Sequence, residues 1–340
     1  MGARDFKVRG TLMSNTPYST PWRNNGHTEA FRRRVSYWLA ILLCVSTLLL
    51  LGAGALVTST GSSLAVPDWP LAYGQLFPPM VGGILFEHGH RLAAMLVGLI
   101  TVILAVWLWR VERRQSIRWF GVGLVLLVIF QGVLGGITVL YLLPKAISIS
   151  HAITAQTFFL LSVGLGQMVS PRLETLRKRG AQVAVTQPGG PLFALGIVTL
   201  TLLMLTLLMG AVVRHFNAGL AIPDFPLAYG GLIPPLSAFP ILIHFTHRVL
   251  GVLAFLAVGA TVWMARRRFA AERPLMRLAW LMLILVVAQI LLGGLIIWSQ
   301  KAVLMTTFHV MNGAALIGAT GLLTLRARFY KGLPAARKAA

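Results

Sequence analysis

An eight-residue stretch, PDWPLAYG at residues 67–74, returns as PDFPLAYG at residues 223–230. Seven of the eight positions match, at an offset of 156 residues. A second pattern is a glutamine followed by Leu-Gly-Gly; it occurs at Gln131 with Leu134-Gly135-Gly136 and at Gln289 with Leu292-Gly293-Gly294, 158 residues apart. Two motifs that recur at nearly the same offset indicate that the chain contains two copies of one ancestral unit. The repeated loops, rich in proline and aromatic residues, are interpreted as rigid lids at the membrane surface.

Long apolar runs flank each repeated loop. The chain has 340 residues, of which 57% are hydrophobic and only 11% charged, whereas soluble domains carry about 25% charged residues. A run of roughly 20 apolar residues spans a bilayer as a helix. We therefore predict an all-α membrane protein, in contact with the lipid bilayer, with eight transmembrane helices. They lie near residues 35–58, 86–109, 119–142, 148–170, 191–213, 244–265, 276–298 and 303–325.

Basic residues gather in every second connection between these spans. The two tails and the connections after the second, fourth and sixth spans hold 25 of the 30 Lys and Arg residues. Positive charge marks cytoplasmic segments, so we predict a cell-membrane protein with both termini in the cytoplasm. The net charge of +22 is divided among these clusters instead of covering one face. This distribution argues against a nucleic-acid partner.

Each repeat unit holds four spans, so both units enter the membrane from the same side. We predict two tandem, parallel four-helix bundles. The first apolar run is full length and lacks a cleavage site, so it is interpreted as a retained helix after a disordered tail. The predicted organisation is an N-terminal tail over 1–34, an N-terminal half over 35–170, a linker over 171–190, a C-terminal half over 191–325 and a C-terminal tail over 326–340.

Four histidines obey the same repeat. His90 corresponds to His247, each followed by arginine, and His151 corresponds to His309. All four lie near the outer end of an even-numbered span, and ionisable groups inside a membrane are usually functional. Zinc or copper would require three or four ligands, whereas two imidazoles on opposite faces of a planar ring suit a six-coordinate heme iron. Each half is therefore predicted to bind one heme, with the adjacent Gly-Gly pair leaving room for the porphyrin.

Arg91 and Arg248, which follow the first histidine of each pair, are candidates to bind heme propionates, with interfacial anchoring as the alternative. The halves differ at one position: Glu87 lies three residues before His90, and His244 takes that place before His247. A carboxylate beside a heme can take a proton or stabilise a developing cation, so Glu87 is the candidate catalytic residue. Three further histidines are given no heme role; His88 is predicted to face the loop, and His27 and His215 to be solvated.

These features together resemble the heme A synthase family, over about residues 35–325. The resemblance rests on the two four-span halves, the Pro-Asp-Trp-Pro loop and the following residues: Glu87, His90-Arg91, Gln131, Leu134-Gly135-Gly136, His151, His247-Arg248 and His309. It implies that a ring methyl of the substrate heme O is oxidised to a formyl group by successive hydroxylations. It also implies that His247 and His309 hold a heme b cofactor, and that His90 and His151 bind the substrate heme.

The resemblance further implies that heme O is handed over by the farnesyltransferase that forms it, and that an electron acceptor exists, which the sequence does not identify. Many family members carry a cysteine pair in the first outer loop, but residues 60–66 contain none and Cys44 is the only cysteine. Thiol redox in that loop is therefore excluded. Two alternatives stay open: a diheme cytochrome b that only transfers electrons, and a transporter with parallel repeats. The oligomeric state is also open, with a homo-oligomer among the alternatives.

Overall fold

Eight long helices make up most of the described chain. The computed structural model describes residues 25–171, 173, 190–270 and 272–328. The helices are α1 (Asn25–Ser59), α2 (Gly82–Val111), α3 (Gln115–Leu140), α4 (Lys145–Met168), α6 (Pro191–His215), α7 (Phe239–Phe269), α8 (Arg273–Trp298) and α9 (Val303–Ala327). Within the described residues all eight are long and apolar enough to cross a bilayer. This confirms the predicted all-α class with eight spans, and the protein is a multi-pass membrane protein.

Helix α1 begins earlier than predicted. It starts at Asn25, inside the segment 1–34 that was predicted to be a disordered tail. Glu29, Ala30 and the three arginines that follow are good helix formers, and a helix that is already nucleated gains one hydrogen bond for each residue added. The prediction is therefore wrong for residues 25–34. Residues 1–24, most of the predicted linker and residues 329–340 lie outside the described residues.

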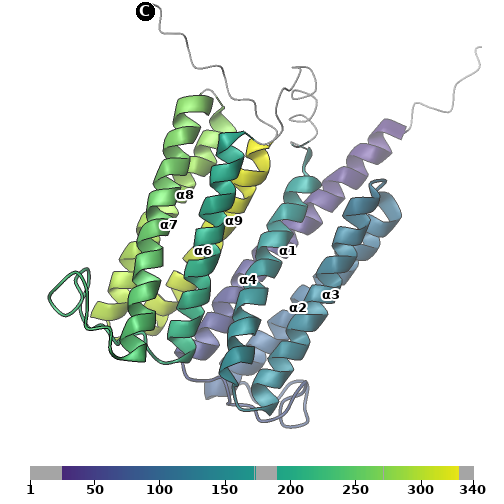
Figure 1. Ribbon diagram of the computed structural model, residues 1–340. Helices are drawn as coiled ribbons and strands as arrows, with labels where there is room; N and C mark the ends of the chain where they lie inside the picture. Colours follow the sequence, from purple (N-terminus) through teal and green to yellow (C-terminus); the bar gives the residue numbers. More distant parts are fainter. Residues whose placement is uncertain (1–24, 172, 174–189, 271, 329–340) are drawn as a thin grey trace, which may run out of the picture.

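The helices of each half pack in a closed order. Helix α1 contacts α2 and α4, and α3 contacts the same two; likewise α6 and α8 each contact α7 and α9. Between the halves, α4 lies against α6 and α9, and α9 lies against α1 (Figure 1). Small residues permit this approach, since a Cβ added at Gly318 of α9 would lie 2.9 Å from the ring of Phe159 in α4. Helices α4 and α9 therefore form the centre of the molecule.

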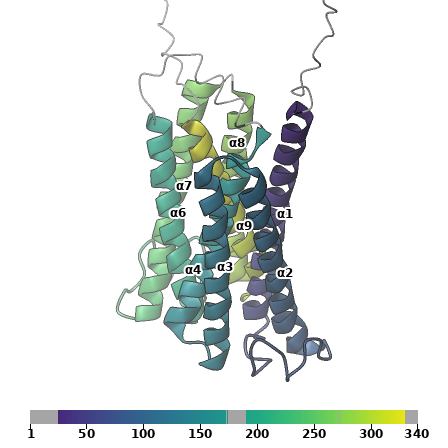
Figure 2. The same ribbon diagram turned by 90° about the vertical axis from the view of Figure 1, so that its right-hand side faces the viewer.

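The two ends of the molecule differ. Helix α1 begins and α9 ends at one end, whereas the long connections 60–81 and 216–238 lie at the other, which we call the loop end (Figures 1 and 2). The outward faces of the helices expose large apolar side chains such as Leu126, Leu256 and Ile284. A bilayer covers such surfaces, because hydrocarbon requires no polar groups from the protein.

Candidate heme-binding sites

The repeated histidines form one pair in each half. His90 and His247 are each the ninth residue of their helix, and His151 and His309 are each the seventh. A helix rises about 1.5 Å per residue, so all four lie roughly 9–12 Å from the loop end of their helices. The structure therefore places all four histidines at a similar depth, two in each half, as the repeat predicts.

Each of these four rings packs against a glycine of the preceding helix. A Cβ added at the glycine would lie close to Cε1 of the ring: 3.1 Å for Gly54 and His90, 3.0 Å for Gly210 and His247, 3.5 Å for Gly135 and His151, and 3.5 Å for Gly293 and His309. A larger side chain at Gly54 or Gly210 would displace the ring. Gly135 and Gly293, expected to line a heme cavity, thus have a histidine as neighbour. Gly54 and Gly210 went unnoticed in the sequence, although they lie 156 residues apart.

The second nitrogen of each ring shows how well the pairs suit a heme. Nδ1 of His247 lies 3.0 Å from the carbonyl oxygen of Thr206, and a donor at Nδ1 leaves Nε2 as the metal-binding atom. Nδ1 of His90, His151 and His309 is buried without a hydrogen bond of good geometry among the described residues. Each of these rings nevertheless has a backbone carbonyl group within reach, those of Leu50, Gln131 and Gln289 respectively. No group of three or more His, Cys, Asp or Glu side chains gathers in the described residues. Paired imidazoles on facing helices are a donor set that fits heme iron.

Arg91 fastens the first repeated loop to α2. Its Nη1 donates to the carbonyl oxygens of Asp68 (2.6 Å) and Leu71 (2.8 Å), and its Nη2 to that of Val66 (3.3 Å). Nη2 also forms an ion pair of 2.6 Å with Oε1 of Glu87, and both side chains are almost fully buried. Oε2 of Glu87 accepts a hydrogen bond from the backbone N–H of Val66 at 2.9 Å. Arg91 therefore has protein acceptors already, and its contact with a propionate stays a prediction.

Arg248 holds the second repeated loop in the same way, but without a carboxylate. Its guanidinium donates to the carbonyl oxygens of Asp224 (2.8 Å) and Ile222 (3.2 Å). His244 stands in for the glutamate: Nδ1 accepts from the N–H of Ile222 at 3.3 Å, and Nε2 lies 3.4 Å from Nε of Arg248. The carboxylate of one half and the imidazole of the other therefore share one structural role, with shorter bonds to the carboxylate.

Each loop is further tied by its own side chains. Asp68 accepts hydrogen bonds from the N–H groups of Tyr73 (2.7 Å) and Gly74 (2.8 Å). These bonds, that from Gly74 first, hold the pKa of the Asp68 carboxyl below its usual value. The ring of Trp69 packs on α3, where a Cβ added at Gly136 would lie 2.9 Å from it. The second loop repeats these contacts through Asp224, Tyr229, Gly230, Phe225 and Gly294. Both loops are therefore held over the loop end by the same set of contacts.

The predictions for the remaining three histidines have different outcomes. His88 is fully buried, and its Nε2 lies 2.7 Å from the carbonyl oxygen of Leu76, so it faces the loop as predicted. His215 is partly buried instead of freely solvated. It ends α6 beside Arg214, whose guanidinium reaches across to Ser59 of α1 at 2.8 Å. The side chain of His27 lies outside the described residues.

Comparisons with known proteins match most of the chain. Residues 81–320 match the family model described as cytochrome oxidase assembly protein. A heme A synthase of Halalkalibacterium halodurans is 32% identical, over 79% of this chain and 89% of its own length. Heme A synthases of Symbiobacterium thermophilum (33% identical, 75% of this chain and 84% of its own) and Alkalihalophilus pseudofirmus (29%, 84% and 95%) are also similar. The matched residues 81–320 include Glu87 and all four paired histidines.

Proposed function

The chain belongs to the cytochrome oxidase assembly protein family, with the heme A synthases, and from this we propose that it oxidises a ring methyl group of heme O to a formyl group. It is an enzyme of heme A biosynthesis. The observation that carries the proposal is the presence of two equivalent histidine pairs, of which only the N-terminal one has a buried carboxylate one helical turn away. Such an arrangement suits one heme that is the substrate and one that is a permanent cofactor.

The proposed division of labour places the substrate heme between His90 and His151, and a heme b cofactor between His247 and His309. The buried Glu87 beside the N-terminal pair, where the C-terminal pair has His244, supports this division. Heme b, when bound, supplies one-electron transfer.

The proposed role of Glu87 is to assist chemistry at the substrate methyl. Oxidising a methyl group removes electrons and protons, and a positive charge that develops on the carbon is stabilised by a nearby carboxylate. Arg91 and the N–H of Val66 fix both oxygens of Glu87. Each carboxylate oxygen has a second lone pair, so Glu87 keeps acceptor capacity toward a substrate. Its position one turn before His90, on the same side of α2, supports a role beside the proposed substrate heme.

The proposed orientation puts both termini in the cytoplasm of the cell membrane, with the loop end outside. The distribution of basic residues supports it. Reporter fusions placed after Gly74 and after Gly230 are expected to report the outer side, and a fusion after Arg268 the cytoplasm. Alkaline phosphatase and green fluorescent protein fusions measure this directly. A cytoplasmic signal at either loop would contradict the orientation and the parallel relation of the halves.

The function is tested by expression in bacterial cells that make heme O but no heme A. Hemes extracted from their membranes and separated by chromatography are expected to include heme A only when the protein is present. Heme O that persists unchanged, with the protein correctly inserted, would favour the electron-transfer alternative. The proposal also assigns delivery of heme O to the farnesyltransferase that forms it, and transfer of the electrons to a separate acceptor. Assembly as a homo-oligomer stays a proposal.

A further inference from the structure

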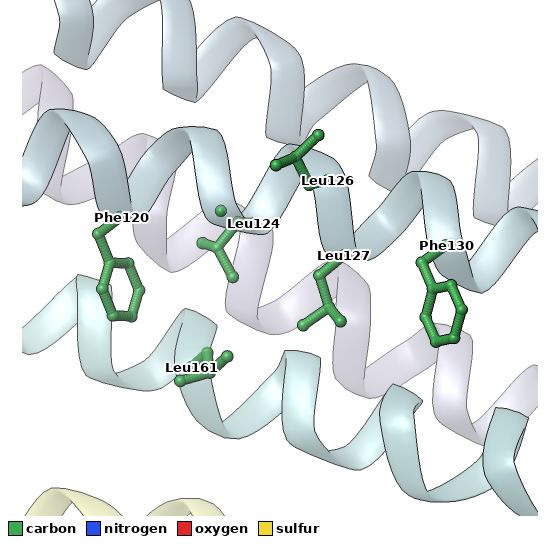
Figure 3. Close-up of a pocket in the computed structure, with 7 residues that line it drawn as sticks. Phe120, Leu124, Leu126, Leu127, Phe130 and Leu161 are labelled. Carbon is green, nitrogen blue, oxygen red and sulfur yellow. The ribbon is translucent and has the colours of Figure 1, made fainter.

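An apolar groove lies between α3 and α4 on the N-terminal half. It is a shallow groove with a volume of about 370 Å³, lined by Phe120, Gly123, Leu124, Leu126, Leu127 and Phe130 of α3 and by Leu161 of α4. In Figure 3, Phe120, Leu127 and Phe130 stand in a row along α3 and are directed toward α4, which carries Leu161. Phe130 is 50% exposed, so the groove is open to the bilayer. Pockets that hold small ligands are typically apolar and about 300–1,000 Å³ in volume.

The groove begins beside the proposed substrate site. Phe130 precedes Gln131, whose side-chain N–H donates to the carbonyl oxygen of His151 at 3.0 Å. Five residues after Phe130, Gly135 packs against the ring of His151. Phe130 lies near the middle of α3, and from there the groove follows the helix to Phe120, ten residues or about 15 Å farther from the loop end. A chain attached to a heme at this site can therefore enter the groove and run from the middle of α3 toward the opposite end of the helix.

The equivalent face of the C-terminal half is built differently. At the offset of 158 residues that relates α3 to α8, Leu281 replaces Gly123 and Ala288 replaces Phe130. A Cβ added at Gly123 would meet nothing within 4 Å, so this glycine leaves the groove open. In α8 a leucine side chain stands at the corresponding helix position, and no aromatic residue corresponds to Phe130. The residues that leave the groove open are therefore found in the half that we assign to the substrate.

We propose that this groove binds the isoprenoid chain of heme O, an inference that rests on the proposed function. Heme O carries a farnesyl-derived chain of comparable extended length, and heme b carries none. Two axial histidines fix the plane of a heme but leave it free to rotate about the axis through the iron. A chain held off that axis stops the rotation, so that one particular methyl stays beside Glu87. Orientation of this kind is a large part of catalysis.

The test compares Gly123→Leu with Gly132→Ile, two variants that each introduce the residue of the C-terminal half. Gly132 also lies on α3 and a Cβ there meets nothing within 4 Å, but it does not line the groove. The purified proteins, carrying heme b, are placed in phosphatidylcholine nanodiscs and titrated with heme O or with heme b, which lacks the chain. Absorbance in the Soret region reports binding at the second site.

The wild-type protein is expected to bind heme O more tightly than added heme b. Gly123→Leu should weaken heme O binding about tenfold, since losing the burial of a few methylene groups has that effect, and leave heme b binding unchanged. Gly132→Ile should change neither. Unaltered heme O binding in Gly123→Leu would mean that the groove holds only lipid, and equal weakening of both hemes would mean that the variant disturbs the histidines; either overturns the inference. A wild-type protein that binds neither heme at a second site would overturn the proposed function as well.

Discussion

Replacing Glu87 with histidine is expected to abolish heme A formation while leaving the heme b content unchanged. Histidine fills this place in the other half, where His244 accepts from Ile222 and faces Arg248. The variant therefore retains the anchoring of the loop and removes the carboxylate. Loss of a positioned acid or base typically lowers the rate about 10²–10⁴-fold. The measurement is extraction and chromatography of hemes from cells that also produce heme O.

Glu87→Ala should also make little or no heme A, but it is a less specific change. It leaves the buried guanidinium of Arg91 without its ion pair, and an unpaired buried charge strongly destabilises a protein. Partly oxidised hydroxymethyl heme is expected if only the second oxidation is blocked. The matched control is His244→Ala, which removes an imidazole instead of a carboxylate, from the C-terminal half, and should be much milder. Near-normal heme A in Glu87→His, or equal losses in the Glu87→Ala and His244→Ala variants, would remove the carboxylate from the mechanism.

Replacing His247 or His309 with leucine is expected to eliminate bound heme b and its low-spin absorption spectrum. In the proposed assignment these two residues are the ligands of the heme b iron, and a leucine side chain offers no atom that binds iron. His215→Leu is the control, because this histidine is partly buried at the loop end of α6, near the end of the molecule where both pairs lie, but belongs to neither pair. The pyridine hemochrome spectrum of the purified protein, divided by protein concentration, gives the heme b content. Full heme b content in either variant would show that the ligands are assigned wrongly.

Much of the fold could be predicted, because a bilayer imposes simple rules on a sequence. Apolar runs of sufficient length mark the spans, and the repeat offset matches His90 with His247 and His151 with His309 without any knowledge of structure. The early start of α1 at Asn25 was missed, since hydropathy marks where a helix enters the bilayer and not where it begins. Hydropathy likewise gives no information on the path of the two long loops.

The site was predicted less completely, for a physical reason. The acceptors of Arg91 and Arg248 are mostly backbone carbonyl oxygens in irregular loops, and no residue type identifies such acceptors. The difference between Glu87 and His244 was visible in the sequence, but their common contact with the loop backbone was not. The groove depends on a residue pair that the repeat does reveal, Gly123 and Leu281. That Gly123 lines a groove becomes apparent only when α4 is placed beside α3.

The division of labour between the two halves is the central claim, and the hemes bound to purified His90→Leu protein test it most directly. Wild-type protein from cells that make heme O is expected to yield heme b together with heme O or its oxidised forms. His90→Leu should yield heme b alone, in the same amount per chain, because only the N-terminal pair is broken. Loss of heme b from His90→Leu, or retention of heme O and heme A in it, would contradict the assignment of the substrate to the N-terminal half.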